Sequence, residues 1–291
     1  MVKILAFDTE TSDRAPYIPG TTTWENSKKL LSIKDLKKKN SMWSSLLVKW
    51  PHIIQLAYIL YDTDHPATKT KIFNKYIDID DDVIISDESL AIHHISKDKI
   101  SSVEANSRAK IQDALKEFLK DVKKADVIVG HNVAFDRRMI VAELLRLTKD
   151  TKTDEDISAN IIDKKIVTMM KDKKFKCTQE ITKPLCKLKI MSSKECHQYK
   201  TPKLIESYEH FFGCIPKLEM LHDALIDTII TLRVYCISLK IDPFDINHTN
   251  KIITSYINKI SPAKCKTFNK TINKKNRNPK GKKTRKNLGL I

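Results

Sequence analysis

The chain has 291 residues, of which 41% are hydrophobic, enough for one large core, and it lacks any apolar stretch near the ~18 residues that a membrane-spanning helix needs. Its first residues, "MVKILAFDTE", pass from a short apolar segment into acids, which argues against a secretory signal. We therefore expect a cytoplasmic or nuclear protein that is not secreted and has no membrane partner. The net charge of +17, from 53 Lys and Arg against 36 Asp and Glu, favours a polyanionic partner such as nucleic acid over a purely solubilising role.

Three strands are predicted in the first part of the chain. The apolar, β-rich segment "VKILAFDTE", residues 2–10, predicts a buried strand. Residues 12–50 are long for a strand-to-strand connection and predict an insertion or long loop over the site. Residues 52–62 and 71–79 predict the next two strands, with a polar turn between them.

Helices and a further strand follow. Residues 102–125 have apolar side chains at helical spacing, and residues 126–132 form a short apolar segment that runs directly into a helix. This strand–helix unit predicts a parallel strand that is covered by helices. Three more helices are predicted at residues 202–213, 222–240 and 250–260.

Two segments differ in composition from the rest. Residues 171–200 are rich in Lys and Cys and predict a second insertion or long loop. Its cysteines form no Cys-x-x-Cys pair, which favours free thiols over a zinc site. All six cysteines are expected to be reduced. Residues 263–291 are polar and basic and predict a disordered tail that binds phosphates or serves nuclear targeting, with a functionless end as the alternative. Residues 1–262 would then be one folded domain.

Carboxylates gather at predicted element ends. Asp8 and Glu10 are two residues apart at the end of the first strand, so they share a face at the edge where open α/β sheets bind ligands. A solvated strand end would explain this pair alone. Asp136 lies one turn into the helix after the fourth strand, and Asp227 has aliphatic neighbours on a later helix. A carboxylate in such surroundings is costly unless it is paired with Lys or Arg, or bound to metal.

Such a set of acids suits a hard cation. Magnesium or manganese prefers oxygen ligands, and two such ions can clamp the attacking and leaving oxygens of a phosphodiester. A histidine of near-neutral pKa can accept the proton of the attacking water, and His222 stands five residues before Asp227. On a helix these two residues would be about 140° apart, with His222 near the helix start and Asp227 facing inward.

The segments "FDTET", "HNVAFD" and "HDALID" resemble, in order, the three motifs of the DEDDh family of proofreading-type 3′–5′ exonucleases, which have the ribonuclease H-like fold. The resemblance covers residues 2–240. It implies that four acids bind two Mg²⁺ or Mn²⁺ ions and that His222 is the general base; the acids are Asp8, Glu10, Asp136 and Asp227. Asp223 is interpreted as a helix cap or a solvated residue.

A further segment, "DESLAIHHIS", resembles the family region near the terminal nucleotide. The family usually has Gly after the histidine of this region, where His94 stands here, and a loop with two solvated histidines is the alternative. Asn132 would orient the entry of the following helix, or be an ordinary N-cap. The resemblance implies five substrate-binding residues: Thr9, Thr11, Glu88, His93 and Asn132.

Together these features predict an α/β domain of ribonuclease H-like fold, with a five-stranded mixed sheet flanked by helices. The predicted function is metal-dependent 3′–5′ exonuclease hydrolysis of nucleic acid, preferably DNA, releasing 5′-nucleotides in proofreading, repair or DNA degradation. A DNA polymerase is a candidate partner. The alternatives are an exoribonuclease that trims RNA, a non-catalytic nucleic-acid-binding module, and a ribonuclease H-like endonuclease.

Overall fold

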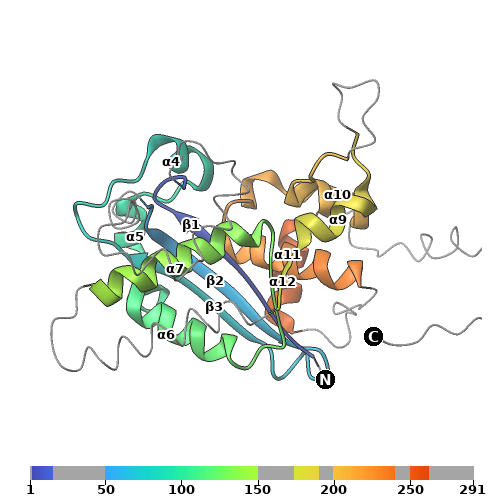
Figure 1. Cartoon of the computed structure of the whole chain (residues 1–291), viewed down its shortest axis with the longest axis horizontal. Coiled ribbons are helices and arrows are strands. Elements are labelled where there is room, and N and C mark those ends of the chain that lie inside the picture. Colours follow the sequence, from blue (N-terminus) through green and yellow to red (C-terminus); the bar gives the residue numbers. More distant parts are fainter. Residues whose placement is uncertain (1, 16–49, 150–173, 190–198, 240–249, 262–291) are drawn as a thin grey trace, which may run out of the picture.

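The fold was obtained as a computed structural model that describes residues 2–15, 50–149, 174–189, 199–239 and 250–261 (Figure 1). Most of the predicted insertion at residues 12–50 and the whole predicted tail at residues 263–291 lie outside the described residues. Within this described part, no helix is long and apolar enough to cross a membrane.

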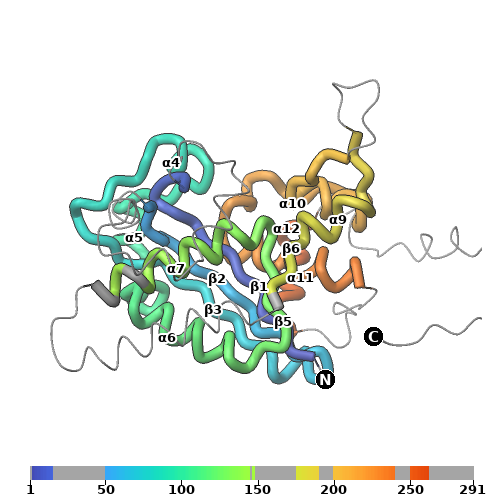
Figure 2. The backbone as a smooth tube through the Cα atoms, in the orientation of Figure 1, coloured from blue at the N-terminus to red at the C-terminus, as the bar shows by residue number. Residues whose placement is uncertain are grey.

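A mixed sheet of six strands forms the centre, in the order β4-β3-β2-β1-β5-β6. Figure 2 labels β1, β2, β3, β5 and β6 along the course of the backbone. The strands are β1 (Lys3–Thr11), β2 (Ile53–Asp62), β3 (Lys71–Asp78), β4 (Arg108–Lys110), β5 (Val127–Gly130) and β6 (Lys174–Cys177). β1 pairs antiparallel with β2 and parallel with β5, and β2 pairs antiparallel with β3. The mixed α/β fold is confirmed.

The prediction of five strands was one strand short. The two outermost strands, β4 and β6, have only three and four residues, "RAK" and "KFKC", which is too short for alternation of polar and apolar residues to identify a strand. Both pair in parallel with an inner strand, β4 with β3 and β6 with β5, and this pairing makes them strands. β6 and the helix α9 (Thr178–Cys186) also occupy much of the segment 171–200, which was predicted as a loop.

Helices cover both faces of the sheet (Figure 1). On one face lie α6 (Ile111–Val122) and α7 (Val133–Lys149); on the other lie α10 (Leu204–Phe212), α11 (Ala224–Ser238) and α12 (Lys251–Ile260). Smaller elements are α4 (Asp87–His93), α5 (Lys97–Ser102), η1 (Ala105–Ser107) and η2 (Leu218–Met220). β2 is buried over its whole length, as expected for a strand with helices on both sides.

Buried acids away from the end of β1 have cationic partners. The Asp121 carboxylate accepts hydrogen bonds from the Tyr58 hydroxyl at 2.8 Å and the Lys124 ammonium at 2.7 Å, and also from Lys71. Burial acts to raise the pKa of Asp121, but these donors outweigh it and the pKa is lowered. Glu143 is likewise paired with Arg146 at 3.0 Å. The negative charges of Asp121 and Glu143 are therefore compensated by nearby cations.

The cysteines differ in part from expectation. Cys177, Cys186 and Cys236 form no disulfide, as predicted. Cys214 is disulfide-bonded, so the prediction that every cysteine is reduced is wrong for this residue. Sequence spacing does not reveal which thiols a fold brings within bonding distance.

Candidate active site

β1 directs its carboxylates toward α11. Leu5 and Phe7 belong to the core cluster under α6 and α7, whereas Ile4 and Ala6 belong to the cluster under α11. Because side chains alternate along a strand, residues 8 and 10 continue the α11 side and residue 9 continues the α7 side. The predicted common face of the two acids is therefore present, and both are half-buried.

Asp136 enters the site from α7. It is 3% exposed, and its Oδ1 accepts hydrogen bonds from the Thr9 backbone N–H at 3.1 Å and the Thr9 hydroxyl at 2.8 Å. These two donors fix one carboxylate oxygen and leave the other for a ligand. Thr9 thus positions Asp136, and its predicted substrate contact stays a prediction.

His222 and Asp227 reach the site from the start of α11. The helix begins at Ala224, and the Asp223 carboxylate accepts from the N–H groups of Leu225 at 3.0 Å and Ile226 at 3.3 Å, which is the capping role foreseen for it. His222 therefore precedes the helix, and the prediction that it lies on the helix at about 140° from Asp227 is wrong.

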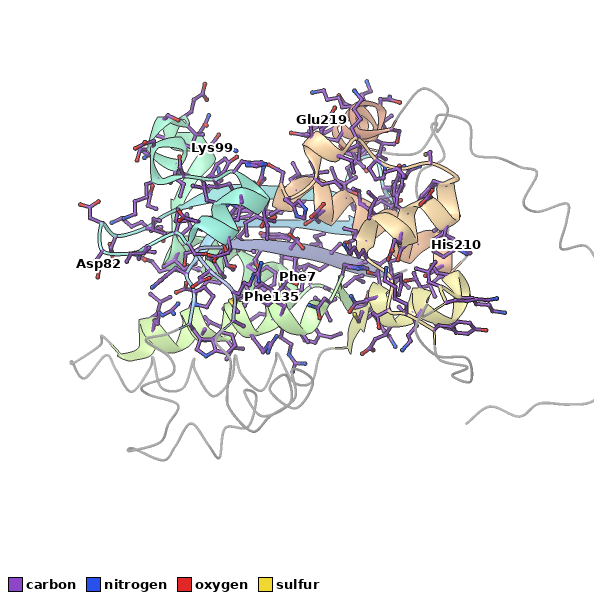
Figure 3. All side chains as sticks on the ribbon, turned by 90° about the horizontal axis from the view of Figure 1, so that it is seen from above. Phe7, Asp82, Lys99, Phe135, His210 and Glu219 are labelled. Carbon is purple, nitrogen blue, oxygen red and sulfur yellow. The ribbon has the colours of Figure 1, made fainter. Side chains whose placement is uncertain are left out.

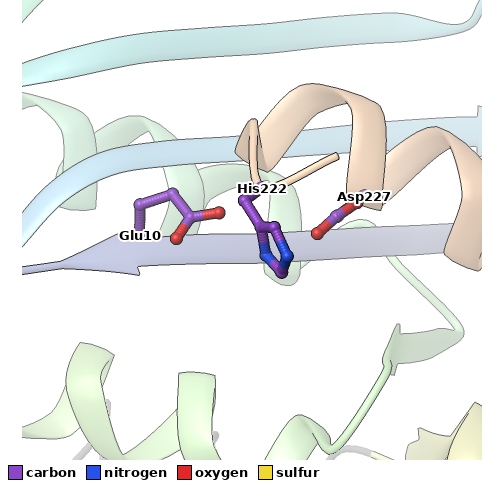
Figure 4. Close-up of side chains that lie close together, drawn as sticks. All are labelled: Glu10, His222 and Asp227. Carbon is purple, nitrogen blue, oxygen red and sulfur yellow. The ribbon is translucent and has the colours of Figure 1, made fainter. Parts of the chain in front are cut away.

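A left-handed backbone brings His222 to the acids. Its φ is +62°, a conformation that few residues other than Gly and Asn adopt without strain. Glu10, His222 and Asp227 each offer a ligand atom within 4.8 Å of the other two, and Figure 4 shows the three side chains together. His222 is exposed, so it is accessible to substrate and water.

Gln55 holds this segment in place. It lies opposite Glu10 in the β1–β2 pairing and is fully buried. Its Oε1 accepts from the Ala224 N–H at 3.2 Å, and its Nε2 donates to Asp223 Oδ2 at 3.2 Å and to Asn74 Oδ1 at 3.0 Å. Sequence analysis missed this residue, although a lone glutamine in the apolar segment "IIQLAYILY" was a signal that a buried amide has a specific partner.

Replacing Gln55 by Leu is expected to lower the free energy of unfolding by about 2–4 kcal/mol, because a buried N–H and a carboxylate oxygen lose their partner. The midpoint and slope of urea unfolding measure this loss. Gln112→Leu, on the exposed side of α6, is the matched control and should change stability by less than about 0.5 kcal/mol. Equal effects of the two changes would contradict the bracing role of Gln55.

The segment predicted to lie near the terminal nucleotide is α4 and its end. His93 is 5% exposed; its Nδ1 accepts from the Ile95 N–H at 3.0 Å, so its Nε2 carries the proton and donates to the Thr11 carbonyl at 3.2 Å. His94 has φ +55°, so this chain keeps the backbone that Gly would adopt. The alternative of two solvated histidines is wrong for His93, and Glu88 is exposed in the first turn of α4.

Thr11 and Asn132 flank the acids. Thr11 is buried, and its hydroxyl donates to the Asp13 carbonyl at 2.8 Å, while its own carbonyl is held by His93. Asn132 is exposed immediately before α7 with φ +61°, and its carbonyl accepts from the Phe135 N–H at 2.8 Å. Their contacts with substrate stay predictions.

The acids at this edge repel one another. Burial, followed by the charges of Asp136, Asp227 and Glu10, raises the pKa of Asp8 well above its usual value. Burial and then Asp227 raise the pKa of Glu10 to about 9. Burial raises the pKa of Asp227 to about 7 and that of Asp136 to about 6. These directions are the opposite of those at the paired acids Asp121 and Glu143.

The donor set fits a hard divalent cation. Asp227 Oδ1 is buried and has no hydrogen-bond partner within the described chain. Nor does any Lys or Arg of the described ranges form an ion pair with the four acids. Carboxylate oxygens that are both convergent and unpaired are the ligands that Mg²⁺ or Mn²⁺ takes.

The metal-free protein is expected to lose stability as the pH rises from 7 to 9. The pKa of Glu10 is about 9 in the fold, against about 4.3 in an unfolded chain. The folded state therefore holds more protons in this range, and the free energy of unfolding falls with rising pH. Because Glu10 is half-buried, the expected loss is only on the order of 1 kcal/mol.

Unfolding in a chelator at pH 7, 8 and 9 measures this slope. The range avoids buried histidines such as His131, whose pKa burial lowers to about 4, because they add stability only as the pH rises toward about 6.5. Glu10→Gln should flatten the slope. A wild-type stability that rises over the range would contradict the described electrostatics.

Comparison with known proteins identifies the family of the chain. A ribonuclease H-like sheet with acids at the end of its first strand defines a class of nucleases, and a family model described as "Exonuclease" (RNase T) matches residues 45–235. The chain belongs to this exonuclease family and is a DEDD-type 3′–5′ exonuclease. The matched segment begins after β1, so Asp8 and Glu10 precede it. No curated protein matches the sequence significantly.

Several solved structures are similar at low identity. A 3′-exonuclease described with the histone mRNA stem-loop is 12% identical, with 82% of this chain and 81% of that chain covered and a TM-score of 0.45. Exonuclease I of E. coli with a dA16 oligonucleotide is 14% identical, with 88% and 46% covered and a TM-score of 0.47. Cell-death related nuclease 4 is 14% identical, with 81% and 64% covered and a TM-score of 0.40. This chain thus spans less than half of that Exonuclease I chain.

Proposed function

We propose that this exonuclease removes nucleotides from the 3′ end of DNA by hydrolysis with two divalent cations, releasing 5′-nucleotides. One observation carries the proposal: four carboxylates from β1, α7 and α11 influence one another at a single edge of the sheet, and none of them forms an ion pair with a Lys or Arg of the described residues. DNA is preferred because the motifs resemble those of proofreading-type enzymes, and RNA is the alternative.

The roles of the residues follow from their places. Asp8, Glu10 and Asp227 would hold one ion, and Asp8 with Asp136 would hold the second, as the motif resemblance implies. Bound ions would supply positive charge to the scissile phosphate and acidify the attacking water. An imidazole nitrogen of His222 would accept the proton of that water. His93 acts through Thr11, whose carbonyl it fixes beside the acids.

End-labelled substrates test the proposal. With Mg²⁺, a 5′-labelled single strand should shorten progressively, and a 3′-labelled strand should release its label at once as a mononucleotide. Chelation should stop both reactions. The same sequence as DNA, RNA, matched duplex and mismatched duplex determines the substrate preference.

Other outcomes select the alternatives. Cuts in a circular single strand would indicate an endonuclease. Binding of DNA without cleavage, with either Mg²⁺ or Mn²⁺, would indicate a binding module. Faster removal of ribonucleotides would overturn the DNA preference. Association with a DNA polymerase, and location in the cytoplasm or nucleus, stay proposals from the sequence.

A further inference from the structure

Two consecutive arginines follow the acid of α7. Arg137 and Arg138 stand directly after Asp136, and both side chains are half-buried. Among the described residues, neither arginine forms an ion pair with a carboxylate, whereas Arg146 on the same helix is paired with Glu143 at 3.0 Å. A half-buried cation that lacks an anionic partner is unusual, because burial disfavours its charge.

Aromatic rings hold the two guanidinium groups. The guanidinium carbon of Arg137 lies 4.5 Å from the centre of the Phe175 ring in β6, and that of Arg138 lies 5.7 Å from the centre of a ring of Trp50. A cation over an aromatic face is attracted by the ring. Such stacking orients the planar guanidinium group and leaves the N–H groups at its edge for an anion.

The terminal nitrogens of both arginines are accessible. Arg137 Nε is buried without a hydrogen-bond partner in the described part of the chain, and Arg138 Nε donates to the Ala134 carbonyl at 3.0 Å. No group of the described residues accepts a hydrogen bond from the Nη atoms of either arginine, and these atoms are not buried. Burial lowers the pKa of both groups, but a guanidinium group stays charged in proteins. Each arginine therefore offers oriented, charged donors that suit a phosphate.

These groups lie beside the acids, on the α7 side of the sheet. α7 begins directly after β5, and helical side chains point back toward the start of their helix, as the hydrogen bond of Arg138 within α7 shows. The charge of Arg138 also acts on Asp136, against the effect of burial on the pKa of that acid. Figure 3 shows Phe135 of α7 and Glu219 of η2, the element before α11, on opposite sides of the sheet. The arginines and the start of α11 therefore flank the acids from opposite sides.

We propose that Arg137 and Arg138 bind phosphates of the substrate strand on the 5′ side of the scissile bond. This placement rests on the proposed function, in which one ion faces the attacking water beside His222 and the other, near Asp136, faces the leaving 3′ oxygen. The preceding nucleotide carries that oxygen, so the 5′ part of the strand begins on the side of Asp136. The two arginines make a strand of several nucleotides a better ligand than a dinucleotide, which has only the scissile phosphate.

The salt dependence of binding tests this proposal. Binding of a 5′-labelled single strand of about 12 nucleotides is measured by fluorescence anisotropy over a range of KCl concentrations, with a chelator that prevents hydrolysis. Each phosphate of a single strand that a cation neutralises contributes about 0.7 to the slope of log K against log salt. Arg137→Gln and Arg138→Gln should therefore each reduce this slope by about 0.7, whereas Arg137→Lys and Arg138→Lys, which keep the charge, should retain it.

Arg108→Gln is the matched control. Arg108 is a half-buried arginine on β4, the outermost strand farthest from β6, and it pairs with Asp78 at 3.7 Å, so its variant should keep the wild-type slope. A labelled dinucleotide should bind wild type and all variants equally, because it lacks the phosphates that the arginines contact.

Unchanged slopes in both Gln variants would overturn the proposal, as would a loss of dinucleotide binding as large as the loss for the long strand. Because the two arginines stack on different rings, either variant tests the proposal where the other unfolds, which a melting temperature identifies. The chelator removes hydrolysis from the measurement, so this test and the test of the exonuclease activity can fail separately.

Discussion

Asp8→Asn is expected to lower the rate of Mg²⁺-dependent hydrolysis by roughly 10³-fold or more. The charges of Asp136, Asp227 and Glu10 all act on Asp8, so Asp8 shares its site with the other three acids. The amide removes a charge that the bound ions need, and metal ions contribute several kcal/mol to phosphoryl-type reactions, at 1.36 kcal/mol per tenfold in rate. Initial rates on a labelled oligonucleotide measure the loss.

The same variant should be more stable than wild type when no metal is present. Burial and neighbouring carboxylates disfavour the ionised form of Asp8, and an amide of nearly the same shape carries no charge to be disfavoured. Adding Mg²⁺ should reverse the order, because only wild type gains binding free energy from the ions. Melting temperatures with chelator and with Mg²⁺ test both halves of this expectation.

Asp113→Asn is the control for this change. Asp113 is exposed in the first turn of α6, so its variant should hydrolyse the oligonucleotide at the wild-type rate. Undiminished cleavage by Asp8→Asn would show that the acids do not carry the reaction. A lower metal-free stability of Asp8→Asn would show that its charge is compensated in the fold.

Strand periodicity made the position of Asp8 and Glu10 predictable. Alternation alone placed the two acids on one face at the end of β1, and the same rule puts Thr9 on the opposite side, where it meets Asp136. Helix signals similarly located α7 and α11, which carry the other acids. Local periodicity sufficed here because each residue sits inside a long, regular element.

The rest of the site depends on tertiary contacts, which cannot be predicted from the periodicity of the sequence. His222 reaches Glu10 and Asp227 only because its backbone is left-handed, and position 222 holds neither Gly nor Asn, the residues that usually mark such a turn. The brace that holds this turn is Gln55, 169 residues from its partner Ala224. Short edge strands such as β4 were missed for the same reason, because whether so short a segment becomes a strand depends on the strand with which it pairs.

His222→Asn is expected to lower kcat by about 10²–10⁴-fold with a smaller change in KM, because the carboxylates that bind the ions remain. Asn is chosen because it tolerates the left-handed backbone that His222 adopts, so the loss reports on the imidazole and not on strain. Burial, followed by the charge of His94, lowers the pKa of His222 below its usual value of about 6.5. At saturating Mg²⁺, wild-type activity should therefore rise with pH through a limb below that value, and the variant should lack this limb.

Lys187→Asn is the control that separates loss of the imidazole from any effect of placing Asn at a left-handed position. Lys187 is exposed at the end of α9 with φ +51°, so it makes the same kind of substitution at a left-handed position away from the acids, and its kcat should equal that of wild type. A His222→Asn variant that retains full kcat and the same pH limb would assign proton acceptance to another group. The carboxylates would then have to serve both as ligands and as base, and these roles conflict because a bound cation favours the ionised form of its carboxylate ligands.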